Sequence, residues 1–116
     1  MKKAIIGAVL TFSSLPVLAN TMSCYVDTPA YDTFTTSYCS AAIFDGPRTT
    51  SAVFRIDNPP SNIQSVIWSD SACSSSSTSC ITTVRAYDPK TVTATVLKTD
   101  GTYFQVSATA EYELGF

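Results

Sequence analysis

The sequence predicts a small exported all-β domain, an antiparallel β-sandwich of about seven strands, and three observations lead to this prediction. Apolar and polar residues alternate along several short segments, which is the pattern of strands that bury one face. Turn-forming residues separate these segments at intervals of about 8–12 residues, as they do in sandwiches and barrels. No stretch of useful length shows the 3.6-residue period of a helix.

The first nineteen residues have the three parts of a secretory signal peptide. Lys2 and Lys3 form a charged start, residues 4–10 an apolar run, and residues 17–19 a small-x-small cleavage site. The apolar run is too short to span a bilayer, so we expect cleavage before Asn20 and no membrane insertion. The mature chain, residues 20–116, is then a single domain located in the periplasm or outside the cell.

The expected strands follow one another between turns rich in Pro, Gly, Asp and Asn. Residues 58–61 (Asn-Pro-Pro-Ser) cannot continue a ladder, and residues 45–47 and 88–89 end two other strands in the same way. Residues 71–79 form a serine-rich loop. The expected strands cover residues 22–26, 37–44, 51–57, 63–69, 81–87, 91–96 and 104–113.

The last two strands predict their own register. Their apolar residues all have even numbers, so the numbers of two residues that face each other must add up to an even number. A two-residue turn at Asp100-Gly101 breaks this condition, whereas a three-residue loop over residues 99–101 satisfies it and places Val96 opposite Phe104. In such a loop the third residue is left-handed, a conformation that Gly101 adopts without a steric penalty.

Four cysteines, an even number in an exported chain, predict two disulfides. Three connectivities are possible, and we favour the local pairs Cys24–Cys39 and Cys73–Cys80 because each brackets a loop-like stretch. A zinc site is not favoured, because the chain has no Cys-x-x-Cys pair and no histidine.

A tryptophan in a mid-chain strand, Trp68, and the long hairpin from Thr91 to Glu113 carry a resemblance to known modules. Over residues 50–113 the chain resembles immunoglobulin-like and PKD-like modules of secreted bacterial proteins. The resemblance implies an immunoglobulin-like sandwich with Trp68 in the core, an architecture that hosts many functions. The cysteines depart from the immunoglobulin pattern, in which one cysteine precedes the tryptophan and another follows it at a longer distance.

Composition argues against catalysis and against nucleic acid as a partner. Without histidine there is no Ser-His-Asp or Cys-His machinery and no ordinary metalloenzyme centre, and oxidised cysteines supply no nucleophile. The turn aspartates do not form a calcium loop of Asp-x-Asp-x-Asp-Gly type. The mature chain has five basic and nine acidic residues, whereas nucleic-acid binding needs a basic face. We expect a non-enzymatic protein without a cofactor.

Two surfaces are candidates for recognition of a protein or a glycan. Tyrosine supplies rigid contact area, which favours an aromatic surface near the N-terminus, and a disulfide-closed loop loses little entropy on binding. The candidate residues are Tyr25, Tyr31, Phe34 and Tyr38 in the first surface, and Ser75, Ser76 and Thr78 in the loop. We expect a monomer. The alternatives are a structural or accessory subunit of the cell surface, or a secreted inhibitor that uses the loop between Cys73 and Cys80.

Overall fold

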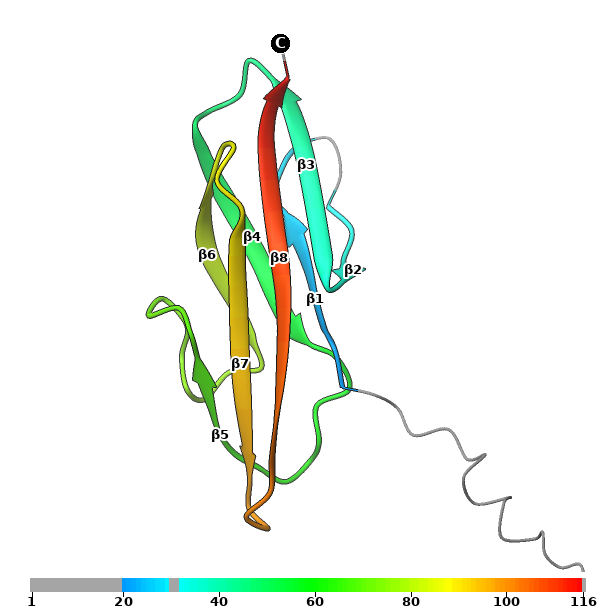
Figure 1. Ribbon diagram of the computed structural model, residues 1–116, viewed down its shortest axis with the longest axis vertical. Coiled ribbons are helices and arrows are strands. Elements are labelled where there is room, and N and C mark those ends of the chain that lie inside the picture. The colour runs from blue at the N-terminus through cyan, green and yellow to red at the C-terminus, as the bar shows by residue number, and fades with distance from the viewer. Residues whose placement is uncertain (1–19, 30–31, 116) are drawn as a thin grey trace, which may run out of the picture.

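The computed structural model describes residues 20–29 and 32–115, so the expected signal peptide, residues 1–19, lies outside the described residues. The described chain forms two four-stranded sheets packed face to face (Figure 1). Their strand orders are β2-β1-β4-β6 and β3-β8-β7-β5. The predicted β-sandwich is therefore confirmed. Within residues 20–29 and 32–115 there is no helix long and apolar enough to cross a membrane.

Seven of the strands correspond to the expected ones, and their ends differ by at most two residues from the expected ends. The additional strand is a two-residue strand, β2, which pairs with β1. The first sheet contains β1 (Met22–Val26), β2 (Thr35–Thr36), β4 (Thr49–Ile56) and β6 (Ser79–Arg85). The second sheet contains β3 (Tyr38–Phe44), β5 (Ile63–Trp68), β7 (Lys90–Lys98) and β8 (Tyr103–Gly115).

One strand pair differs from the expected antiparallel arrangement. β3 runs parallel to β8, with Tyr38 opposite Thr109 and Phe44 opposite Gly115. Residue alternation reports which face of a strand is buried and carries no information on strand direction. Because β3 and β8 lie far apart in the sequence, no short turn fixes their relative direction either.

The final hairpin has the predicted register. Val92 pairs with Ala108, Ala94 with Val106, and Val96 with Phe104. Gly101 has a φ of 89°, the left-handed conformation expected at the third loop position. The Lys98 amide donates to the Thr102 carbonyl at 2.9 Å and closes the loop.

The core lies between the two sheets and consists of the residues that alternate inward along each strand. Its largest fully buried side chains include Tyr112, Phe54 and Met22. Trp68, expected in the core, is half-buried and packs against the core cluster. Its indole Nε1 donates to the Ser77 carbonyl at 3.2 Å, so its polar atom has a partner, as buried tryptophans require.

Both expected disulfides are present. The bond between Cys73 and Cys80 closes the serine-rich loop, with a Cα–Cα distance of 5.1 Å. The bond between Cys24 and Cys39, with a Cα–Cα distance of 5.7 Å, joins β1 to β3. Since these strands belong to opposite sheets, this second bond is a covalent link across the sandwich.

Candidate functional site

Two of the expected recognition residues, Tyr25 and Phe34, contact each other on the outer face of the first sheet. Tyr25 points outward from β1 because its neighbours Cys24 and Val26 are buried. Phe34, just before β2, packs on Tyr25 edge to face, with 4.8 Å between ring centroids and 87° between ring planes. The guanidinium carbon of Arg55, on β4, lies 3.9 Å from the centroid of the Phe34 ring. Edge-to-face and cation–π contacts each stabilise such a cluster by about 1 kcal/mol.

Tyr38 belongs to the other sheet, yet it shares a hollow with Tyr25. The hollow measures about 250 Å³ and its wall also includes hydroxyl side chains of Thr33, Thr35 and Ser40. The Tyr38 side chain is exposed, and its hydroxyl donates to the Glu111 carboxylate on β8. This hydrogen bond to Glu111 is the main reason that the pKa of Tyr38 lies above its ordinary value. We use the name aromatic surface for Tyr25, Phe34, Tyr38 and Arg55.

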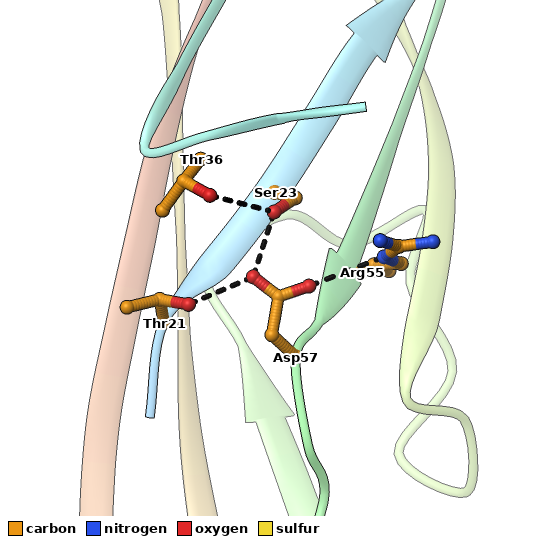
Figure 2. Close-up of polar contacts among 5 residues, drawn as sticks. All are labelled: Thr21, Ser23, Thr36, Arg55 and Asp57. Carbon is orange, nitrogen blue, oxygen red and sulfur yellow. Dashed lines mark hydrogen bonds and ion pairs between the residues drawn. The ribbon is translucent and has the colours of Figure 1, made fainter. Parts of the chain in front are cut away.

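A second, larger groove of about 550 Å³ is lined by Phe34 and Arg55. Figure 2 shows the polar cluster in this groove, with the Asp57 carboxylate at its centre. Asp57 Oδ2 accepts hydrogen bonds from the hydroxyls of Ser23 at 2.6 Å and Thr21 at 2.8 Å. Asp57 Oδ1 accepts from Arg55 Nε at 3.1 Å. The remaining lining residues are Thr36, Ile56, Asn58 and Pro59.

The carboxylate of Asp57 is held in its charged form. Burial acts to raise the pKa of Asp57, but the hydrogen bonds from Ser23, Thr21 and Arg55 outweigh it and bring the pKa below its ordinary value. At neutral pH the groove therefore contains an ion pair, Arg55 with Asp57, surrounded by hydroxyl groups. The charges of this pair balance, so the groove offers donors and acceptors without a net charge from these two residues.

The serine-rich loop is attached to the framework at several points. The Ser75 carbonyl accepts from the Val66 amide on β5 at 3.1 Å, and the Thr78 carbonyl accepts from the Ile56 amide on β4 at 2.9 Å. The Ser76 hydroxyl lies 3.0 Å from the Ser74 hydroxyl within the loop. The loop leads into β6, on the side of β4 that faces away from β1, and its last residue, Ser79, pairs with Arg55 of the aromatic surface.

The structure brings together three of the four expected aromatic residues, while Tyr31 lies outside the described residues. Sequence reasoning missed the Arg55–Asp57 pair as part of this surface. The signal was present, because both residues alternate outward from a strand whose other face is apolar. What the sequence does not contain is the position of Phe34, which lies 21 residues before Arg55 and reaches it only through the fold.

In the described part of the chain, no three His, Cys, Asp or Glu side chains are placed to hold a metal ion. Comparison of the chain with protein-family models, with curated proteins and with solved structures finds no match.

Proposed function

We propose that this protein is an exported, non-enzymatic recognition module that binds a glycan or a protein through the aromatic surface. The observation that carries the proposal is the contact of Phe34 with both Tyr25 and Arg55, because Tyr25 lines the first hollow while Phe34 and Arg55 line the larger groove. Aromatic residues and arginine supply most of the energy at recognition surfaces, and exposed clusters of them are uncommon elsewhere. The two disulfides are compatible with an exported protein.

An immunoglobulin-like architecture is part of this proposal, and the strand order supports it. β1, β4 and β6 lie in the order of immunoglobulin strands A, B and E, and β5, β7 and β8 in the order of strands C, F and G. Trp68 lies on β5, the counterpart of the strand that carries the immunoglobulin tryptophan. The disulfide departs from that pattern, because it joins β1 to the edge strand β3 and not β4 to β7, the counterparts of strands B and F.

The chemistry of the two hollows favours a glycan over a protein. The two hollows are lined by serine and threonine hydroxyls, which donate and accept hydrogen bonds as sugar hydroxyls do. The six residues are Thr21, Ser23, Thr33, Thr35, Thr36 and Ser40. Phe34 and the two tyrosines offer ring surfaces on which the apolar face of a sugar ring can pack. The balanced charges of Arg55 and Asp57 suit an uncharged ligand.

The test is a binding screen of the labelled mature protein on an array of bacterial cell-wall and capsular polysaccharides. The wild-type protein is compared with Phe34→Ala and Tyr38→Ala. Phe44→Ala serves as the matched control, because Phe44 is aromatic and 74% exposed but lies at the C-terminal end of β3 and lines neither hollow. For each glycan that the wild-type protein binds, we expect the affinity of Phe34→Ala and of Tyr38→Ala to be at least about tenfold lower. The control variant is expected to bind with the wild-type affinity. Binding that is unchanged in Phe34→Ala and Tyr38→Ala would contradict the proposal.

A further inference from the structure

β8 is longer than the strands beside it, and half of one edge has no strand partner among the described residues. β7 pairs with residues 103–110 of β8, whereas β3 pairs only with residues 109–115. Figure 1 shows the lower half of β8 extending beyond the start of β3. From Tyr103 to Ala108, β8 therefore has a strand on its β7 side alone.

The hairpin bonds identify which backbone groups point toward this open edge. The Lys98 amide donates to the Thr102 carbonyl, so Lys98 and Thr102 form a hydrogen-bonded pair. Hydrogen-bonded and non-hydrogen-bonded pairs alternate along an antiparallel ladder. The pairs that contain Phe104, Val106 and Ala108 are then hydrogen-bonded to β7. The N–H and C=O groups of Tyr103, Gln105 and Ser107 point away from β7, in the direction in which the Thr109 amide reaches Ser37.

At two other sheet edges, local hydrogen bonds occupy some of the backbone groups. At the β5 edge, the Val66 amide donates to the Ser75 carbonyl of the serine-rich loop. At the β6 edge, the Ser79 amide donates to the Ser77 hydroxyl, and the Arg85 carbonyl accepts from the Asp88 amide. Residues 103–108 of β8 contain no proline and no charged residue, the features with which proteins protect exposed edges.

We propose that this edge of β8 pairs with the same edge of a second copy of this chain, antiparallel about a two-fold axis. Gln105 then faces Gln105 of the second copy, and Tyr103 faces Ser107 of the second copy. In this register each odd-numbered residue, whose N–H and C=O point to the open edge, faces an odd-numbered residue of the second copy. Backbone donors therefore meet backbone acceptors along the whole segment. The limits of the open segment agree with this register. The segment starts after Thr102, which closes the hairpin loop, and ends at Thr109, which lies opposite the first residue of β3.

The pairing also continues the alternation of faces across the interface. Phe104 and Val106 point toward the core layer. In this register Phe104 faces Val106 of the second copy, and Val106 faces Phe104 of the second copy. Phe104 is only half-buried in the single chain, so a neighbouring strand covers more of its ring. The proposal differs from the sequence-based expectation of a monomer. Three residues of the aromatic surface, Tyr25, Phe34 and Arg55, lie on or beside the other sheet, whereas the fourth, Tyr38, begins β3 and lies opposite Thr109 at the end of the open segment. The proposal rests on the backbone groups of β8 and on none of these four side chains.

The test is sedimentation equilibrium of the mature protein with two variants at one position. Gln105→Pro removes the amide that points to the open edge and leaves the bonds to β7 intact, whereas Gln105→Ala keeps the amide. Both variants lose the hydrogen bond from the Gln105 side chain to Thr95, so a difference between them reports the backbone at residue 105, where proline removes the amide and fixes φ. We expect concentration-dependent dimers for the wild type and Gln105→Ala, and a dissociation constant at least about tenfold higher for Gln105→Pro.

A wild-type protein that stays monomeric at about 1 mM would overturn the proposal, as would a Gln105→Pro variant that dimerises as well as Gln105→Ala. Amide exchange of the wild type gives a second readout that needs no variant. The Gln105 and Ser107 amides must become slower to exchange as the protein concentration rises, while the already bonded Val106 amide changes little. Equal exchange of the Gln105 amide at low and high concentration would also overturn the proposal.

Discussion

Cys24 and Cys39 join the two sheets, and the residue next to each of them in the sequence, Tyr25 and Tyr38, lines the same hollow. One covalent bond therefore stabilises the sandwich and also fixes the spacing of two aromatic side chains from opposite sheets. The Cys73–Cys80 bond has no such role, because it closes a short loop at the start of β6.

The two disulfides are predicted to differ in what their removal changes. Loop-closure entropy gives a loss of about 3 kcal/mol for Cys24→Ala with Cys39→Ala, and about 2.5 kcal/mol for Cys73→Ala with Cys80→Ala. Only the first double variant frees β1 from β3, so only there do we expect faster amide exchange at Tyr25 on β1 and at Ala41, whose amide points toward β8. Denaturant unfolding measures the stability, and amide exchange measures the local effect. Equal exchange at both residues in the two double variants would contradict this distinction.

Acid is predicted to weaken the contact between Asp70 and β7. The Asp70 carboxylate accepts from Lys90 Nζ at 2.8 Å, from the Ala72 amide at 2.9 Å and from the Thr82 hydroxyl at 2.8 Å. Led by the bond from Lys90, these contacts lower the pKa of Asp70 to about 2 from an ordinary value of 3.8. A carboxyl group with a lower pKa in the folded state stabilises the fold above its unfolded pKa and loses this effect as the pH falls.

We therefore expect the contribution of Asp70, of the order of 1–2 kcal/mol, to be present at pH 6 and to disappear between about pH 4 and pH 2. Asp70→Asn removes the titrating group, so its deficit relative to the wild type must shrink across the same interval. Unfolding free energies of both proteins at several pH values test this. A deficit that stays constant down to pH 2 would show that Asp70 does not titrate in this way.

Gly101 and Gly46 are predicted to resist substitution for different reasons. At Gly101, with φ of 89°, an added Cβ meets nothing within 4 Å, so Gly101→Ala costs only the left-handed conformation, about 1 kcal/mol. Gly101→Asn must cost less, because asparagine tolerates this conformation. At Gly46 an added Cβ lies 2.8 Å from the Tyr112 hydroxyl, so the cost there is steric. Thermal unfolding of Gly101→Ala, Gly101→Asn and Gly46→Ala measures these costs. If Gly101→Asn were less stable than Gly101→Ala, the conformational reason would be refuted.

The sequence was sufficient for local features and insufficient for contacts between distant segments. The parity of Val96 and Phe104 determined the hairpin register, because a short loop leaves few choices. The disulfide pairs were also correct, although the argument from loops did not foresee that the Cys24–Cys39 bond crosses the sandwich. The parallel pairing of β3 with β8 could not be predicted, since alternation is identical in parallel and antiparallel strands.

The aromatic surface shows the same division. A tyrosine-rich segment near the N-terminus was recognisable as a candidate from composition alone. Its contact with Arg55 and the carboxylate of Asp57 depends on how β2 folds back beside β1, and the sequence gives no turn motif that requires this return.

The most direct test of the account is disulfide mapping of the mature protein by proteolysis without reduction, followed by mass spectrometry. We expect linked peptides that contain Cys24 with Cys39 and Cys73 with Cys80. A peptide that links Cys39 to Cys73 or to Cys80 would contradict the account, because β1 and β3 would then lack their covalent link and Tyr25 and Tyr38 would not be held at one hollow.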